Sequence, residues 1–323
     1  MKAEQTLKAI NSALEASQER EHRKHLGASI IGRSCARSIW YTFRWAKKEK
    51  FRGRMLRLFD RGHKEEDRFI DWLRAIGCEV WTRTPDGKQY RVSDCLGHFG
   101  GSLDGVARGI PEFPTIPMLT EFKTHNEKSF KQFETKMLVS AKYEHYVQCQ
   151  LYMGKMQLEK ALYMGICKNN DALYLEIIDF HPDVYNQYLA RAKFIIFSEV
   201  APPKLNQSPG WWQCQFCNFK DICHNDEVAE KNCRTCCFST PVEKKKWECS
   251  YPEKPVIFRP DNLVIATGCQ HHLFLPDMIG NAKLISLDPG KQWIELEDEL
   301  TGHKYKHGKG YLCSEDLIDK IPF

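Results

Sequence analysis

The sequence predicts an α/β protein in which helices come first, strands follow, and a long helix is embedded between strands. Three observations support this prediction. Apolar residues recur at helical spacing within the first 75 residues, a period-two alternation begins near residue 79, and no internal repeat or low-complexity segment is visible. Strands interrupted by helices in this way are typical of an α/β core.

Each element can be justified in order along the chain. Leu7, Ile10 and Leu14 have helical spacing and predict an amphipathic first helix, and Gly77 ends the third. The predicted helices span about 2–23, 34–46, 51–75, 142–156 and 182–197. The predicted strands span 79–83, 89–92, 101–107, 118–123, 160–167 and 172–178. Alternating apolar residues at 284–287 and 293–296, around Asp288-Pro289-Gly290-Lys291, predict a C-terminal hairpin.

Composition limits the classes of function. The 323 residues are 42% hydrophobic, enough for one large core, with or without a small appendage. No apolar run approaches the roughly 20 residues that span a bilayer, and residues 1–24 lack an apolar signal-peptide core, so we expect a cytoplasmic protein with no membrane partner. The net charge of +5 allows a nucleic-acid partner without requiring one. In a reducing compartment, the grouped members of the fourteen cysteines favour metal or cluster ligation over disulfides.

The pentapeptide Leu119-Thr120-Glu121-Phe122-Lys123 follows Leu103-Asp104-Gly105 at a short distance. On a strand, Glu121 and Lys123 project from one face while Phe122 points the other way into a core. Asp104 would complete a carboxylate pair, which suits Mg²⁺ or Mn²⁺, and a lysine beside that ion can hold or deprotonate a water aimed at a phosphodiester. The alternative is a solvated strand with no catalytic role.

The helix predicted at 142–156 carries His145, Gln148 and Tyr152 on one face. Its apolar neighbours predict that the helix is largely buried. Buried Gln148 and Tyr152 need hydrogen-bond partners, and a phosphate, a base or a metal-bound water would supply them. A solvated helix face is the alternative.

Taken in order, Gly62-His63 with Glu66, then Asp104, Glu121-Phe122-Lys123 and Gln148-x-x-x-Tyr152 resemble the RecB-like branch of the PD-(D/E)XK nuclease superfamily. The resemblance covers about residues 34–223 and implies a restriction-endonuclease-like core, a central mixed sheet flanked by helices. It also implies roles for single residues. His63, Asp104 and Glu121 would bind Mg²⁺ or Mn²⁺ with the carbonyl of Phe122, Lys123 would be the catalytic lysine, and Gln148 and Tyr152 would position DNA. Leu103 stands where the family name has proline, a position that varies in the family.

A second signature consists of Cys214-x-x-Cys217-x-x-x-x-x-Cys223 and the distant Cys35. This layout resembles the iron–sulfur subset of RecB-like nucleases, which includes the AddB nuclease domain and the CRISPR-associated nucleases of spacer acquisition. The resemblance implies a [4Fe–4S] cluster on these four thiolates, tying the N-terminal helices to the C-terminal side of the core. Trp211, Trp212, Phe216 and Phe219 would form its apolar shell. Zinc on the same four thiolates is the alternative.

A third cysteine group lies downstream, where Cys233-x-x-Cys236 is followed by Cys249 and then by Cys269-x-x-His272. Paired thiolates at this spacing, closed by later ligands, are typical of a small structural zinc site. We expect Cys233, Cys236, Cys249 and Cys269 as ligands, with His272 competing for the fourth position. Free surface thiols are the alternative.

We therefore predict residues 1–77 as an N-terminal helical region, 78–225 as the nuclease core with its cysteine cluster, and 226–323 as a zinc-binding, β-rich appendage with a C-terminal hairpin. By the resemblance, the protein is a metal-dependent DNA exonuclease of recombination, repair or end processing, acting on single-stranded or duplex ends. It would work in a bacterial cell, or as a phage protein in the host cytoplasm, beside a strand-annealing recombination protein, and a homo-oligomer is compatible with the sequence. A structure-selective or single-strand endonuclease with the same site, and a non-catalytic DNA-binding scaffold, are the alternatives.

Overall fold

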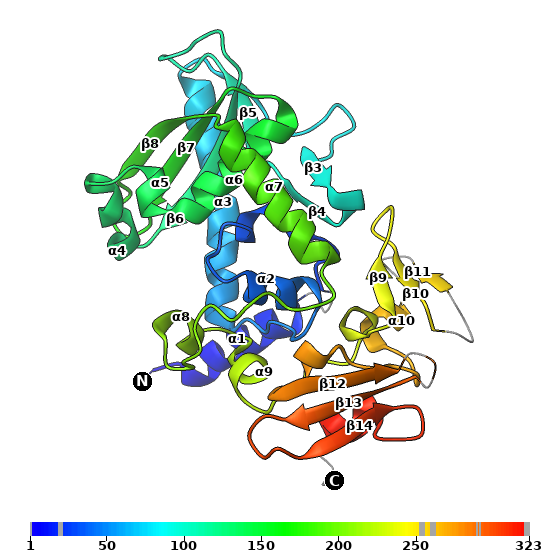
Figure 1. The fold of residues 1–323 in the computed structure, drawn as a ribbon. Coiled ribbons are helices and arrows are strands. Elements are labelled where there is room, and N and C mark those ends of the chain that lie inside the picture. Colours follow the sequence, from blue (N-terminus) through cyan, green and yellow to red (C-terminus); the bar gives the residue numbers. More distant parts are fainter. Residues whose placement is uncertain are drawn as a thin grey trace.

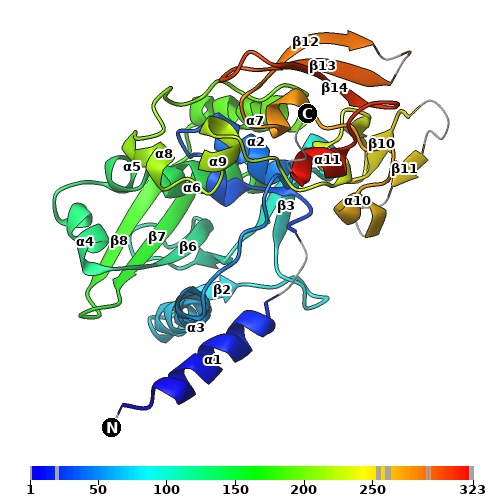
Figure 2. The same ribbon diagram turned by 90° about the horizontal axis from the view of Figure 1, so that it is seen from below.

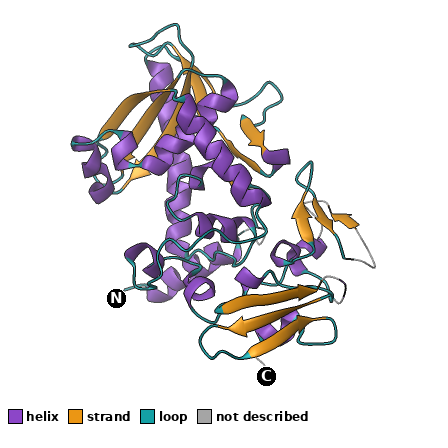
Figure 3. Ribbon diagram, viewed as in Figure 1, coloured by secondary structure: helices purple, strands orange, loops and turns teal. Residues whose placement is uncertain are grey.

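The computed structural model describes residues 2–18, 22–251, 256–258, 263–288, 290 and 292–319. Its elements form a mixed α/β architecture, as predicted, with a central sheet, long helices against it, and smaller C-terminal sheets to one side (Figures 1 and 3). The helices are α1 (Glu4–Ala16), α2 (Ala36–Phe43), α3 (Gly53–Ala75), α4 (Glu127–Phe130), α5 (Leu138–Ala141), α6 (Tyr143–Met156), α7 (Pro182–Phe197), α8 (Trp212–Gln215), α9 (Lys220–His224), α10 (Leu263–Thr267) and α11 (Ser314–Ile318).

The central sheet has the strand order β2-β5-β6-β7-β8. Its strands are β2 (Glu79–Trp81), β5 (Gly105–Arg108), β6 (Met118–His125), β7 (Lys160–Cys167) and β8 (Leu173–Asp179). The β6–β7 pair is parallel, with Glu121 opposite Tyr163, and the other pairs are antiparallel. A parallel pair needs a crossover connection, and α6 lies within the crossover between β6 and β7.

Helices cover both faces of this sheet. On one face, the ring of Phe69 in α3 stacks on Phe122 of β6, with the ring centroids 5.0 Å apart. On the other face, Val147 and Leu151 of α6 belong to the same buried cluster as Leu119 and Tyr163 of the sheet. Because side chains alternate along β6, the residues on either side of Phe122 point toward α6.

Two small groups of elements adjoin the core. Strands β1 (Leu26–Gly27), β3 (Arg91–Asp94) and β4 (Phe99–Ser102) form a sheet in the order β1-β4-β3. Helix α1 packs along α3 at the edge of the molecule and buries none of its residues (Figure 2).

The C-terminal part contains two antiparallel sheets. Their strands are β9 (Ser239–Pro241), β10 (Trp247–Cys249) and β11 (Val256–Phe258), then β12 (Ala282–Asp288), β13 (Trp293–Asp298) and β14 (Lys304–Gly308). The predicted hairpin is therefore present as β12 and β13. Trp247 lies with its ring centroid 5.6 Å from that of Phe43 in α2, so the C-terminal part and the N-terminal helices share one buried cluster.

Several predicted bounds match the structure. Helix α7 and strand β7 begin and end at the predicted residues, and α6 begins one residue later than expected. The strand predicted at 101–107 is instead two strands, β4 and β5, separated by Leu103 and Asp104. No helix in the described ranges is long and apolar enough to cross a membrane.

Candidate active site

The predicted acid and lysine lie in the middle of β6. Glu121 is fully buried, and its Oε1 contacts Nζ of Lys123, which also donates to the Phe122 carbonyl at 3.2 Å. The second carboxylate oxygen of Glu121, Oε2, is buried and has no hydrogen-bond partner. Leaving a buried carboxylate oxygen unsatisfied costs free energy, so this atom is suited to receive a bound water or cation.

Asp104 lies in the short turn between β4 and β5 and is fixed against β6. The main-chain N–H of Phe122 donates to its Oδ2 at 2.8 Å. The next residue, Gly105, pairs with Thr120, and a Cβ at this glycine would lie 2.9 Å from the Thr120 hydroxyl oxygen. A residue without a side chain at 105 thus allows the turn to approach β6 closely and places Asp104 next to Glu121.

Glu66 joins this group from α3. Burial raises the pKa of its carboxyl group, and the negative charge of Asp104 raises it further. Burial likewise raises the pKa of Glu121 to about 7, with the charges of Asp104 and Glu66 adding to the effect and Lys123 opposing it. Three carboxylates share one lysine, so the site carries an excess of negative charge and would gain from a cation.

The donor set fits a hard divalent cation. Asp104, Glu121 and Glu66 offer carboxylate oxygens, the ligand type that Mg²⁺ and Mn²⁺ prefer. Among the residues that the structure describes, no three Asp, Glu, His or Cys side chains are already arranged to hold a metal ion.

A cleft of about 710 Å³ is lined by His63, Glu66 and Lys123, but not by Asp104 or Glu121. His63 is exposed on α3, one helical turn before Glu66, so the two side chains lie on the same stretch of helix surface. The sequence motifs predicted no ligand role for Glu66. Its spacing of three residues from His63 is the signal that would have indicated one.

The two signature residues of α6 are buried beside the site. Tyr152 lies across β4, where a Cβ at Gly101 would be 2.1 Å from its hydroxyl oxygen. Gln148 is 6% exposed, and its Oε1 has no hydrogen-bond partner. His145, on the same helix face, is partly buried and has its Nδ1 2.9 Å from the hydroxyl of Tyr163.

The four cysteines of the predicted cluster line one cavity. Cys35, at the N-terminus of α2, and Cys214, Cys217 and Cys223 surround a space of about 20 Å³. Burial raises the pKa of Cys217, and the thiols of Cys35 and Cys214 raise it further. Of the four predicted shell aromatics, only Phe219 is buried, whereas Trp211, Trp212 and Phe216 are 43%, 61% and 81% exposed. The expected apolar shell is therefore wrong for these three residues.

The downstream cysteines are also neighbours. Burial raises the pKa of Cys233 to about 12, and the thiols of Cys236, Cys269 and Cys249 contribute to that rise. His272 is 5% exposed and its two ring nitrogens are occupied. Its Nδ1 lies 2.8 Å from the Ser314 hydroxyl, and its Nε2 lies 3.0 Å from the Asn232 carbonyl.

Comparison with models of known protein families finds no match. No curated protein matches the chain either. Among solved structures, the protein SSO0001 is similar at 17% identity, with a TM-score of 0.38, over 68% of this chain and 94% of its own. The alkaline exonuclease LHK-Exo from Laribacter hongkongensis is similar at 14% sequence identity, with a TM-score of 0.36. The structure of LHK-Exo in complex with dAMP is similar at 13% sequence identity, with a TM-score of 0.39. Each match covers 58% of this chain and 90% of the exonuclease chain. These likenesses are distant.

Proposed function

We propose that this protein is a divalent-metal-dependent DNA nuclease that hydrolyses phosphodiester bonds, most simply from DNA ends. The observation that carries the proposal is the convergence of Asp104, Glu121 and Lys123, with a buried oxygen of Glu121 left without a partner. Paired carboxylates beside a lysine provide both a place for a cation and a group that can handle the proton of a water.

Each residue of the site has its own proposed role. Asp104, Glu121 and the carbonyl of Phe122 would hold Mg²⁺ or Mn²⁺, with His63 at the mouth of the cleft as a further ligand. When bound there, the ion would neutralise charge on the phosphodiester and polarise a water. Lys123 would orient that water and stabilise negative charge on the phosphate.

Gln148 and Tyr152 would position the DNA and Lys123. Both side chains are buried, the hydroxyl of Tyr152 lies against Gly101 of β4, and Oε1 of Gln148 has no hydrogen-bond partner among the described residues. A ligand amino group or a water would satisfy that acceptor.

An end-labelled assay tests the proposal. Single-stranded and duplex DNA, labelled at either the 5′ or the 3′ end, would be incubated with Mg²⁺ or Mn²⁺ and the products resolved by size. We expect metal-dependent release of short products, abolished by EDTA. Absence of any metal-dependent cleavage of either substrate would overturn the proposal.

An endonuclease with the same residues is the second candidate, since exonucleases and endonucleases share these ligands. Circular single-stranded DNA separates the two, because a strict exonuclease leaves it intact. A non-catalytic DNA-binding scaffold would bind labelled DNA and leave every substrate uncut.

We further propose a [4Fe–4S] cluster on Cys35, Cys214, Cys217 and Cys223, supported by their position around one cavity. Zinc on Cys233, Cys236, Cys249 and Cys269 is proposed for the C-terminal part. The occupied nitrogens of His272 favour Cys269 as the fourth ligand. A role in recombination or repair in a bacterial or phage-infected cytoplasm, beside a strand-annealing protein, completes the proposal.

A further inference from the structure

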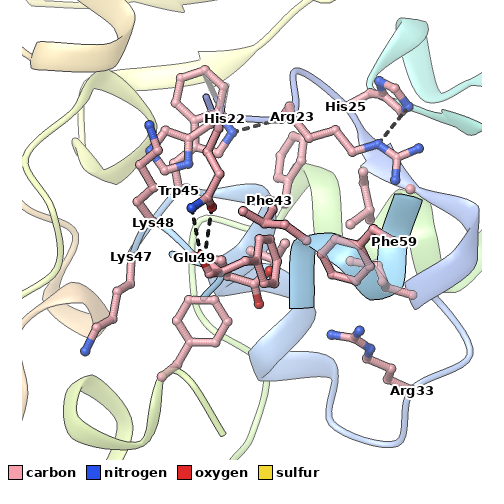
Figure 4. A pocket seen from close by; sticks show the side chains of 18 residues that line it. His22, Arg23, His25, Arg33, Phe43, Trp45, Lys47, Lys48, Glu49 and Phe59 are labelled. Carbon is pink, nitrogen blue, oxygen red and sulfur yellow. Dashed lines mark hydrogen bonds between the residues drawn. The ribbon is translucent and has the colours of Figure 1, made fainter. Parts of the chain in front are cut away.

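A second cavity adjoins the catalytic cleft. It has a volume of about 430 Å³ and lies between the segment around His25 and the start of α3 (Figure 4). Arg23, Phe51 and Phe59 line both this cavity, called here the Arg23 pocket, and the cleft that contains Lys123. A ligand that extends through this shared wall would contact the catalytic lysine at one end and the Arg23 pocket at the other.

Arg23 is held at this wall by neutral groups. Its Nε donates to Nε2 of His25 at 3.2 Å, and its guanidinium lies on the backbone of Gly27, where a Cβ would be 2.2 Å from Nη1. Within the described ranges, no carboxylate forms an ion pair with Arg23, and the side chain is exposed. An arginine fixed in place without a counter-ion is suited to bind a phosphate.

The pocket as a whole is cationic. Among the described residues that line it, the basic side chains are Arg23, Arg33, Lys47 and Lys48, and the acidic one is Glu49 (Figure 4). Two of the basic side chains form ion pairs with carboxylates outside the lining. Nζ of Lys47 lies 2.9 Å from Oε2 of Glu227, and Nε of Arg33 lies 3.8 Å from Oε2 of Glu144. Glu49 accepts a hydrogen bond from Nδ2 of Asn218 at 2.6 Å. Of these four basic residues, Arg23 is the one that also lines the cleft with Lys123.

Aromatic surface accompanies this charge. Phe59 is 41% exposed although its ring packs edge-to-face on Phe51, with the centroids 5.0 Å apart and the planes at 86°. Phe59 therefore keeps exposed aromatic surface beside this contact. Basic side chains interleaved with exposed aromatic rings are typical of sites that bind single-stranded nucleic acid by stacking its bases and contacting its backbone.

We propose that the Arg23 pocket binds an unstacked nucleotide of a single DNA strand, whose neighbouring phosphate lies in the catalytic cleft. Arg23 contacts the backbone at the shared wall, and Phe59 stacks a base. The volume is within the usual range of about 300–1,000 Å³ for small-ligand sites, which suits one nucleotide and not a base pair with its helix. The inference rests on the proposed nuclease function and assigns its substrate as a single-stranded end.

Equilibrium binding tests this assignment. A fluorescein-labelled 20-nucleotide single strand, and its duplex, would be titrated in EDTA at several salt concentrations. Arg23→Ala should weaken single-strand binding by about tenfold and make the slope of log K against log salt shallower by about 0.7, the contribution of one phosphate contact. Phe59→Ala should weaken binding by about tenfold with the slope unchanged, because stacking involves no counterion release.

A base analogue gives a readout that a purely structural role would not affect. We expect 2-aminopurine at one position of the strand to brighten when wild-type protein unstacks it, and to stay dim with Phe59→Ala. Lys304→Ala removes an exposed lysine of β14, outside both cavities, and serves as the charge-matched control. Circular dichroism would confirm that each variant is folded.

The outcomes separate this inference from the proposed function. If wild type binds and cleaves single strands but Arg23→Ala and Phe59→Ala behave like Lys304→Ala, the pocket assignment is wrong and the nuclease proposal stands. If pocket-dependent binding and brightening occur without cleavage, the nuclease proposal fails and the pocket remains a nucleotide site. If wild type binds no DNA, both are overturned.

Discussion

The guanidinium of Arg44 donates to the main-chain carbonyl of Arg234 at 3.2 Å, and both side chains are fully buried. Within the described part of the chain, neither arginine forms an ion pair with a carboxylate. Arg234 instead lies 3.7 Å from the ring centroid of Trp45 and donates to the carbonyls of Phe43 and Lys24 at 2.9 and 3.0 Å. Aromatic faces and carbonyl dipoles thus replace a counter-ion at the junction of the N-terminal and C-terminal parts.

Arg234→Ala should therefore destabilise the whole protein. The change leaves buried carbonyls without donors and opens a cavity among aromatic rings, so we expect a loss of at least about 3 kcal/mol in the free energy of unfolding. Urea titration followed by tryptophan fluorescence would measure it. Arg83→Ala, at an exposed hairpin position, is the matched control and should change stability by less than about 0.5 kcal/mol. Equal stability of the two variants would contradict the proposed role of Arg234.

Lys123→Ala and Asp104→Asn should each reduce DNA cleavage by about 10³-fold or more, because each removes a group expected to act on the charged phosphate. Single-turnover cleavage of labelled DNA would measure the loss, and binding in EDTA should remain within a few-fold of wild type. Lys88→Ala, which removes an exposed lysine from the hairpin at 84–88, should cleave normally. A Lys123→Ala protein with wild-type activity would exclude the proposed role of this lysine.

His98 makes stability depend on pH. Burial lowers the pKa of its imidazole from 6.5 to about 4, although its Nε2 lies 2.8 Å from the Val242 carbonyl. Below about pH 6.5 the imidazole binds a proton in the unfolded chain, whereas in the folded protein it binds one only near pH 4. The free energy of unfolding therefore decreases as the pH falls from about 6.5 to about 4. From pH 7 to pH 5 this one group should contribute a loss of about 2 kcal/mol.

His98→Gln keeps a donor near Val242 and removes the titration. Comparison of urea unfolding at pH 7 and pH 5 should show a smaller loss for this variant than for wild type. An identical loss in both proteins would assign the acid sensitivity to other groups.

Anaerobically purified protein should be brown and absorb near about 400 nm, as expected for iron bound by thiolates. Cys217→Ser should lose the absorbance and the iron, because its Sγ is one of four around the cavity. Cys167→Ala changes a buried core cysteine away from that cavity and should keep both. A colourless wild-type protein with stoichiometric zinc and no iron in this site would decide for zinc.

Substitutions of Cys269 and His272 distinguish which of the two is the fourth zinc ligand. Cys269→Ser should lose about one zinc per chain by elemental analysis, since it removes a proposed thiolate ligand. His272→Gln should keep the metal and lose stability, because both ring nitrogens of His272 serve internal hydrogen bonds. The reverse pattern would make His272 the ligand.

Much of the central fold could be predicted because its elements are long and regular. Helix α7 starts with Pro182 at its first position, and β7 is a nearly continuous apolar run. The first and last residues of both elements can therefore be identified from the sequence. Helices α4 and α5 were missed because four residues are too few to show a helical period. The break at Asp104 was missed although Asp104-Gly105 is a local turn signal; in the structure Asp104 also accepts a hydrogen bond from the main-chain N–H of Phe122.

The candidate site was predictable where its residues are close in sequence. Glu121, Phe122 and Lys123 occupy alternating faces of β6 as expected from strand geometry. The position of Arg23 was not predictable, because it depends on contact with His25 and Gly27 and on the distant start of α3. Those contacts form only when the chain is folded.

The place of β6 in the sheet has a consequence for motion. Hydrogen-bonded neighbours flank it on both sides, β5 and β7, and helices cover both faces. In a hydrogen-exchange experiment its amides should be among the slowest to take up deuterium, whereas those of α1, which buries no residue, should exchange early. The carboxylate and lysine of the site would then stay in place while α1 opens and closes many times.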